Sequence, residues 1–297
     1  MFASLIDIFC AIDDFCKYFS ELNNRFMITD CAKQRNRAFN MSLSEVMTIV
    51  VLFHISHYRT FKDYYKDCIL DHLKSYFPKA VSYNRFVELI PSGLMPLTIF
   101  FCGMTGKETG IYFADSTTIK VCHSKREKRH KVFKGLATKG KNSIGWFFGM
   151  KLHLVINNEG ELMACTLTKA NIDDRKPIPA LMNKLTGWLF ADKGYLGQPL
   201  IDKLKQQAID IFTKVRSNMK ARFMNDAQKY WLSKRGLVET VIDQLKNCCQ
   251  IEHSRHRSPT NAFVNIVAGL VAYCFKPRKP SVKSNRLSVN RYALTSN

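Results

Sequence analysis

The sequence has no apolar run long enough to cross a membrane and no recognisable secretion signal. Its longest aliphatic run, residues 47–53, ends at His54, far short of the ~20 apolar residues that a membrane span needs. The amino terminus has no basic stretch ahead of its apolar residues and carries three aspartates within its first fourteen residues. We therefore expect a cytosolic protein that does not associate with a membrane.

Cysteine pairs of the spacing CxxC are also absent, although the chain has ten cysteines. Scattered cysteines indicate free thiols in a reducing compartment. One alternative is a zinc site formed by Cys248 or Cys249 with His253 and His256. This alternative is the weaker one, because the two cysteines are adjacent and structural zinc sites favour a separation of about two to four residues.

Acidic residues are scarce, with 24 Asp and Glu against 45 Lys and Arg, which gives a net charge of +21. A surplus of this size favours an anionic partner, and nucleic acid is the leading candidate. A generally basic soluble protein is the alternative. Clustering speaks against it, since ten basic residues and a single acidic one, Glu127, lie between residues 120 and 151. We predict that Lys125, Arg126 and Arg129 in this block contact DNA phosphates, and that His123 and His130 are simply solvated.

The first third of the sequence is helical in its pattern. An apolar stripe with steps of three or four predicts an amphipathic helix over residues 5–22. Ser42 and Glu45 form the S-x-x-E capping box of a second helix, and further helices are predicted at residues 60–76 and 83–90. The last of these could be the reading helix of a helix-turn-helix, with Tyr83, Asn84 and Arg85 near its start. A helical bundle without DNA contact explains the same pattern.

Three glycines between residues 103 and 110 mark a boundary, after which the pattern changes from helices to strands. The first three strands read as an antiparallel meander, and the next two alternate with helices. The strands are predicted at residues 111–121, 146–156, 161–168, 188–191 and 209–215, and the helices at 173–185, 199–207, 233–248 and 258–275. We predict an α/β fold with three domains: residues 1–104 helical, 105–278 catalytic, and 279–297 a flexible basic tail.

Two aspartates follow short apolar runs in the same way, in GIYFAD and GWLFAD. Asp115 is predicted to lie within the first strand and Asp192 at the carboxyl end of the fourth. If the first and fourth strands are neighbours, Asp115 and Asp192 come close together. Two buried carboxylates cost several kcal/mol per ion unless a cation lies between them, so a divalent metal is expected. Glu239 is the natural third ligand. It shares a helix face with Arg235, Asp243 and Lys246, although a solvated face with ion pairs would have the same spacing. Asp173 and Asp174 are interpreted as helix caps.

These residues resemble a known family. The order three strands, helix, strand, helix, strand, with Asp115, Asp192 and Glu239 in these places, is similar to the ribonuclease H-like catalytic domain of DDE transposases from bacterial insertion sequences. Ala191-Asp192-Lys193-Gly194-Tyr195 resembles the Asp-x-Gly-Tyr signature. Arg235, Glu239 and Lys246 match the Tyr-x2-Arg-x3-Glu-x6-Lys signature, while Leu232 occupies its Tyr position. The resemblance covers about residues 110–275.

The resemblance implies a bacterial transposase that cuts the ends of its own element and joins them to target DNA. It implies that Asp115, Asp192 and Glu239 bind metal and that Arg235 and Lys246 contact terminal DNA, and we add Lys193 to these contacts. Hard carboxylate oxygens suit two Mg²⁺ ions, with Mn²⁺ as a substitute. Double-stranded DNA is the expected partner, a homodimer is compatible with pairing two DNA ends, and no small-molecule cofactor is expected.

Two other functions fit parts of the sequence. In a phosphotransferase, Asp115 would be the nucleophile of a DxDxT-like motif, but the second Asp of that motif is absent because position 117 is Thr. This function would also leave the net charge of +21 unexplained. A transposase-derived DNA-binding protein without catalysis is the second alternative, and the complete set of three acidic residues speaks against it.

Overall fold

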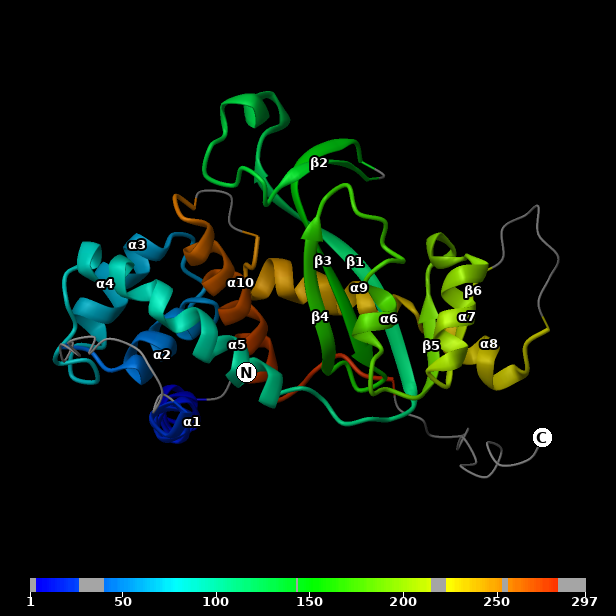
Figure 1. Cartoon of the computed structure of the whole chain (residues 1–297). Helices are drawn as coiled ribbons and strands as arrows, with labels where there is room; N and C mark the ends of the chain where they lie inside the picture. The colour runs from blue at the N-terminus through cyan, green and yellow to red at the C-terminus, as the bar shows by residue number, and fades with distance from the viewer. Residues whose placement is uncertain (1–3, 27–39, 143, 215–222, 253–255, 283–297) are drawn as a thin grey trace. The chain divides into compact units, whose positions relative to one another are not determined.

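The chain is described by a computed structural model over residues 4–26, 40–142, 144–214, 223–252 and 256–282 (Figure 1). It divides into two compact units, each built from separated segments. The first unit contains Met1–Thr105, Ile119–Met150 and Asp243–Arg278; the second contains Gly106–Thr118, Lys151–Ile242 and Lys279–Asn297. The linear domain boundaries remain a prediction. Of the predicted tail, residues 283–297 lie outside the described part.

The helices predicted in the first third of the chain are confirmed. Ser42 and Glu45 form the predicted capping box, and Ser82 caps the helix that starts at Tyr83. The helix at residues 94–103 was not predicted, because Pro91 read as a helix end; the proline lies in the first turn of a 3₁₀ helix, where its missing N–H costs little. The elements are α1 (Leu5–Phe26), α2 (Leu43–Phe53), α3 (Phe61–Asp63), η1 (Tyr64–His72), α4 (Tyr83–Leu89), η2 (Ile90–Gly93) and α5 (Leu94–Gly103).

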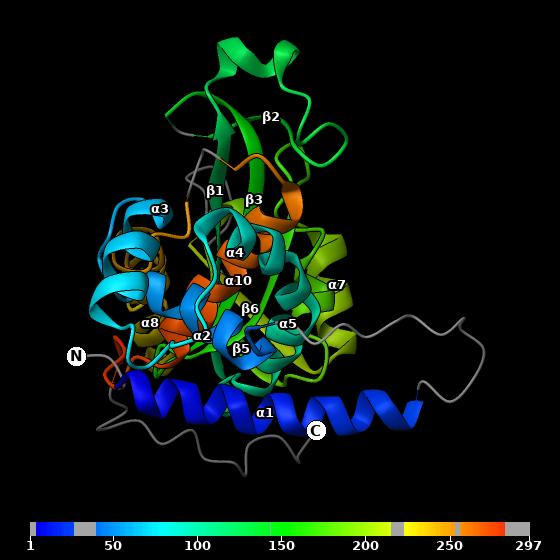
Figure 2. The same ribbon diagram turned by 90° about the vertical axis from the view of Figure 1, so that its left-hand side faces the viewer.

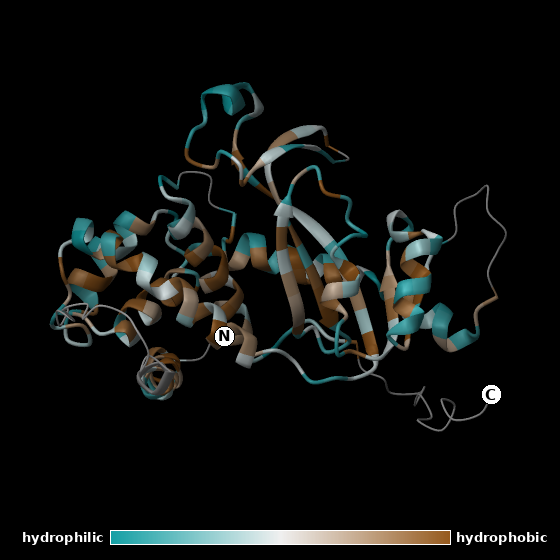
Figure 3. Ribbon diagram, viewed as in Figure 1, coloured by the Kyte–Doolittle hydropathy of each residue, from teal (hydrophilic) through white to brown (hydrophobic). Residues whose placement is uncertain are grey.

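The core of the first unit lies between its apolar helices, which Figure 3 shows in brown. Helix α2 packs against α1 and against α10 (Pro259–Cys274), and α10 also packs against α5. Although no continuous apolar run in the sequence is that long, the stretch Tyr83–Gly103 is long enough and on average apolar enough to cross a membrane, and 39% of the 18-residue window that meets this test is buried. Part of that stretch, α5, contacts α1 and α10, so its apolar surface is used in this packing.

The sheet follows the ribonuclease H-like order. Strand β1 is paired in parallel with β5, which is paired in parallel with β6. On its other side β1 neighbours β3, and β3 pairs with both β2 and β4. The strands are β1 (Ile111–Cys122), β2 (Thr138–Lys141), β3 (Trp146–Asn157), β4 (Leu162–Lys169), β5 (Gly187–Ala191) and β6 (Ile209–Thr213). The five predicted strands are confirmed, and β2 is an additional short strand.

Helices cover both faces of the sheet in the second unit. One face packs on α6 (Ile178–Leu181) and α7 (Gln198–Gln206), with Tyr112, Leu189 and Ile211 in a continuous apolar cluster with these helices. The other face carries the rings of Phe113, Phe190 and Phe212 and is contacted by α8 (Asp226–Ser233), which is followed by α9 (Gly236–Asp243). Helix α8 was not predicted. The predicted helix 173–185 forms only at α6.

Candidate active site

The register of the two central parallel strands sets Asp115 and Asp192 side by side. Ala114 pairs with Ala191, and each aspartate is the next residue of its strand or strand end. Neighbouring strands lie ~4.8 Å apart, and side chains at paired positions point to the same face. Phe113 and Phe190 are paired two residues earlier, so the two aspartates emerge on the face that α8 covers. The predicted neighbourhood of the first and fourth strands of the fold is therefore confirmed.

Asp115 lies in an environment that disfavours its charge. The pKa of Asp115 is raised to about 6, mainly by burial and to a lesser extent by the negative charges of Glu239 and Asp192. The backbone N–H of Ser116, which donates to Asp115 Oδ1 at 2.8 Å, and the guanidinium of Arg235 lower it in part. The three predicted acidic residues therefore interact electrostatically, although they lie far apart in the sequence.

Arg235 holds the third acidic residue. Its Nη2 donates to Glu239 Oε1 at 2.7 Å across one turn, from the residue before α9 to the fourth residue of that helix. The side chain of Arg235 is only 19% exposed, whereas that of Glu239 is 56% exposed. The same guanidinium also lowers the pKa of Asp115, so Arg235 interacts favourably with both carboxylates.

Tyr195 is a residue of this site that the sequence reasoning did not include. It is 3% exposed and follows Asp192 in the 3₁₀ helix η4 (Lys193–Tyr195). Burial and the charges of Asp115, Asp174 and Asp192 raise its pKa, and nearby Ser116 lowers it slightly. Among the described residues its hydroxyl has no hydrogen-bond partner of normal geometry. The signal was present in the Asp-x-Gly-Tyr motif, but a sequence motif does not say that the ring is buried beside three carboxylates.

Asp173 and Asp174 do not cap a helix, which corrects the prediction. Asp173 is bound by the Arg175 side chain in a loop ahead of α6, and burial is too slight to offset this pairing, so its pKa falls to about 2. Asp174 accepts a hydrogen bond from Lys151 Nζ at 2.9 Å, and His153 Nδ1 lies 4.0 Å from the same carboxylate oxygen. Since Asp174 also raises the pKa of Tyr195, it connects β3 to the acidic site.

The predicted DNA contacts fall in different places. Lys193 is exposed next to Asp192, while Lys246 is paired with Glu252 at 3.2 Å in the first unit. Lys125, Arg126 and Arg129 are exposed on the 3₁₀ helix η3 (Ser124–Arg129), also in the first unit. Asn84 and Arg85 are exposed on α4, where the helix-turn-helix stays a prediction. Of the alternative zinc set, His253 lies outside the described residues.

The carboxylate oxygens of the site fit a hard divalent cation, but the side chains of Asp115, Asp192 and Glu239 are not arranged around one common point. Carboxylate oxygens are the ligands that Mg²⁺ prefers, and a buried carboxylate such as Asp115, whose pKa burial raises, is stabilised in its charged form by a nearby cation. Within the described residues, no three His, Cys, Asp or Glu side chains are close enough together to hold one ion. Glu239 is directed to Arg235 instead.

Asp115 should make the metal-free protein less stable as the pH rises. The pKa of its carboxyl is raised from 3.8 to about 6 in the folded state, so its contribution to stability is complete below about pH 4 and is lost as the pH rises through about 6. In a chelating buffer we expect Asp115→Asn to melt at a higher temperature than the wild type above about pH 6, with the difference shrinking towards about pH 4. Thermal melts across this range provide the measurement.

Asp210→Asn is the matched control for that series, because Asp210 is an exposed aspartate on β6, the strand next to β5. It should change the melting temperature equally at every pH. A pH-independent difference for Asp115→Asn as well would show that the buried charge of Asp115 does not limit stability.

The fold and this site together define a ribonuclease H-like protein whose acidic centre has Asp115 inside β1 and Asp192 directly after the parallel strand β5. Comparison with family models is more specific. The chain belongs to the family described as "Transposase DDE domain", whose model matches residues 105–259. No curated protein matches the chain.

Two solved structures show a remote similarity to the chain. One is the cryo-EM structure of the piggyBac transposase synaptic complex with hairpin DNA, at 10% identity and a TM-score of 0.46, covering 90% of this chain and 71% of that chain. The other is the crystal structure of the Mos1 strand transfer complex, at 13% identity and a TM-score of 0.25, covering 81% and 87%. These TM-scores are too low to support an argument about this chain.

Proposed function

We propose that this protein is an active transposase, which cleaves DNA at the ends of its element and transfers the strands into target DNA. The membership of the Transposase DDE domain family supports this proposal. The observation that carries it is the parallel pairing of β1 with β5, in which Ala114 and Ala191 are partners and an aspartate follows each of them. Two neighbouring carboxylates can bind the divalent ions that phosphodiester cleavage uses, whereas they would only destabilise an apolar core.

In this proposal Asp115 and Asp192 would hold divalent ions, Mg²⁺ by preference, and Glu239 would complete the set once its carboxylate leaves Arg235. Such ions would supply Lewis-acid activation of the attacking oxygen and charge stabilisation of the leaving oxygen. The chain itself supplies the other requirements. Arg235 balances the charges of Asp115 and Glu239, and Lys193 lies beside Asp192 where it can bind a phosphate of the incoming strand.

The proposed partner is double-stranded DNA, both the element ends and the target. The net charge of +21 supports it, since neutralising phosphates releases counterions and drives binding. We further propose that Arg235 and Lys246 contact terminal DNA, that the protein acts as a dimer when it pairs two ends, and that it comes from a bacterial insertion sequence and works at the nucleoid.

A plasmid assay tests this function. The full-length protein is incubated with a supercoiled plasmid that carries the candidate element ends, with Mg²⁺, with Mn²⁺ or with a chelator. Nicked, linear and joined products that depend on the divalent ion and on the presence of the ends are expected. A protein that binds these ends but makes no product with either ion would contradict catalysis.

The second candidate, a DNA-binding protein that has lost catalysis, is favoured by one observation. Within the described part of the chain, no three metal-binding side chains are gathered closely enough to share an ion. The two candidates differ in one measurement. An active enzyme gains thermal stability from millimolar Mg²⁺ through Asp115 and Asp192, whereas a protein without a working metal site does not.

A further inference from the structure

A long basic arm extends from the sheet within the first unit. We define the basic arm as Ile119–Met150, which holds the end of β1, the 3₁₀ helix η3, the strand β2 and the start of β3. In both views helix η3 lies at the outer end of the arm, and strand β2 lies closer to β1 and β3 (Figures 1 and 2). The transposase chemistry proposed above uses neither the exposed rings nor the strand pairing of this arm.

The outermost part of the basic arm presents a tryptophan to solvent. Trp146 is 60% exposed at the first position of β3, where it pairs with Lys141 of β2. Lys141 Nζ lies 5.8 Å and Lys139 Nζ lies 4.9 Å from the centre of the Trp146 ring system. An exposed indole with ammonium groups over its ring combines an aromatic face with neighbouring cations, the two features that proteins use to bind nucleic-acid strands.

Hydrogen bonds hold the backbone on both sides of Trp146, so the position of the ring is defined by the fold. Ser124 Oγ donates to the carbonyl oxygen of Trp146 at 3.2 Å, which ties η3 to β3. In the turn before it, Asn142 Oδ1 accepts from the backbone N–H groups of Ile144 and Gly145, both at 3.0 Å. The next residue, Phe147, is 4% exposed. Trp146 therefore stands at the border between a packed strand and solvent.

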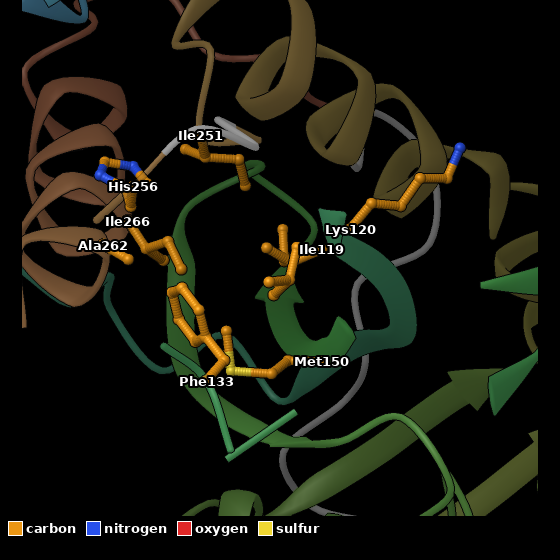
Figure 4. A pocket seen from close by; sticks show the side chains of 9 residues that line it. Ile119, Lys120, Phe133, Met150, Ile251, His256, Ala262 and Ile266 are labelled. Atoms are coloured by element: carbon orange, nitrogen blue, oxygen red, sulfur yellow. The ribbon is translucent and has the colours of Figure 1, made fainter. Parts of the chain in front are cut away.

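The base of the basic arm packs against helix α10 of the same unit. Figure 4 shows Phe133 and Met150 of the arm pointing into a small apolar pocket with Ala262 and Ile266 of α10. Phe133 is 3% exposed, and its ring stacks on His130 at 5.7 Å between ring centres. The outer loop is thus anchored at its base, while its outer surface remains free to bind a ligand.

The outer surface of the basic arm is positively charged. Glu127 is its only acidic residue. Within the described residues, none of the arm's exposed cations forms an ion pair with a carboxylate, so their charge is available to phosphates. The exposed cations are Lys120, Lys125, Arg126, Lys128, Arg129, Lys131, Lys134, Lys139 and Lys141.

We propose that the basic arm binds DNA with unpaired bases, that Trp146 stacks on one unpaired base, and that Lys139 and Lys141 bind the phosphates beside it. A cationic surface alone suits any duplex, but the flat face of an indole has no partner inside a duplex, where both faces of each base are covered by its neighbours. Unpaired bases expose such a face, and aromatic stacking with phosphate contacts is the general way in which proteins bind them. This proposal rests on the proposed function, since cutting element ends produces DNA with unpaired bases.

The experiment compares two labelled DNAs by fluorescence anisotropy, with the full-length protein in a chelating buffer so that no cleavage occurs. One DNA is a fully paired duplex, and the other is the same duplex with a short single-stranded extension. We expect the wild type to bind the extended DNA about tenfold or more tightly. Trp146→Ala should lose this preference while keeping its affinity for the paired duplex, and Trp146→Phe should keep most of the preference because it retains a ring.

Tyr18→Ala is the matched control, because Tyr18 is an exposed aromatic residue of α1, at 61% exposure, in the same unit but outside the basic arm. It should leave the preference unchanged. Tryptophan emission gives an independent reading. Trp231 is fully buried and Trp188 is half-buried, so stacking should quench the exposed Trp146 and the quench should vanish in Trp146→Phe.

Three results would overturn the proposal: equal binding of both DNAs by the wild type, equal weakening of both by Trp146→Ala, or an unquenched Trp146 at saturating extended DNA. If Trp146 stays unquenched, and if the wild type forms oligomers while Trp146→Ala does not, the exposed ring would be a contact between protein chains instead of a DNA contact. A failure of the proposed function can be distinguished from a failure of this proposal. In that case the plasmid assay gives no ion-dependent products, while the preference for the extended DNA remains.

Discussion

Asp192→Asn is expected to abolish ion-dependent cleavage and strand transfer, by about a thousandfold or more, while leaving DNA-end binding largely intact. The size follows from what removal of one essential group costs in other enzymes. Asparagine keeps the shape of the side chain but removes the negative charge that would hold a divalent ion. Binding should survive, because the phosphate contacts proposed here come from basic residues such as Lys193, Arg126 and Arg129, which the substitution leaves in place.

The measurement is the plasmid assay together with anisotropy on an element-end duplex. Asp210→Asn serves again as the control, since it removes one exposed carboxylate from the same unit and should leave both cleavage and binding unchanged. Normal joining by Asp192→Asn would remove Asp192 from the active site. A loss of binding equal to the loss of activity would point to damaged folding or to a DNA contact rather than to metal chemistry.

The strands that carry the acidic residues could be predicted because their physical signal is local. Both GIYFAD and GWLFAD are short apolar runs that end in a carboxylate, and a run of this kind fits a strand covered on both faces. The capping box at Ser42 and Glu45 was equally local, and it starts α2 as expected. These features depend on neighbours within a few residues, so the sequence alone contains them.

The parts that the sequence did not reveal depend on distant partners. Lys151 and His153 alternate with apolar residues in β3, a pattern that does not show whether their side chains are covered. In the fold His153 is fully buried and Lys151 reaches Asp174. Strand β2 has the sequence TKGK, which has no apolar residue, and it exists because it pairs with β3. The bond between Arg235 and Glu239 follows from helical spacing, but the interaction of both with Asp115 requires the fold.

The same limit applies to the completeness of the acidic centre. Sequence order predicts that Asp115, Asp192 and Glu239 belong together, and electrostatic interaction between them supports this. Their separation is set by side-chain conformation on α9, where Glu239 is exposed and bound to Arg235. No pattern of residues encodes which partner this carboxylate chooses. In the proposed active enzyme, a divalent ion would compete with the Arg235 guanidinium for this carboxylate.

Trp231→Ala is expected to destabilise the second unit by ~3–5 kcal/mol, the range for removing a large buried aromatic side chain. Trp231 is fully buried on α8, and its ring centre lies 6.4 Å from that of Phe113, two residues before Asp115. The loss is large beside a total folding stability of ~5–15 kcal/mol. Because Trp231 Nε1 is buried and has no hydrogen-bond partner among the described residues, Trp231→Phe removes an unsatisfied donor and should cost clearly less than Trp231→Ala.

Urea unfolding followed by circular dichroism measures both losses, and the neighbouring Tyr230 supplies the control. Tyr230 is 36% exposed on the same helix, so Tyr230→Ala should cost less than ~1 kcal/mol. Equal costs for the two alanine variants would mean that α8 does not hold the aromatic face of the sheet. If the costs differ as expected, the packing of Trp231 on Phe113 supports the part of β1 that carries Asp115. A destabilised Trp231→Ala should then lose catalysis through misplacement of Asp115, while its basic residues still bind DNA.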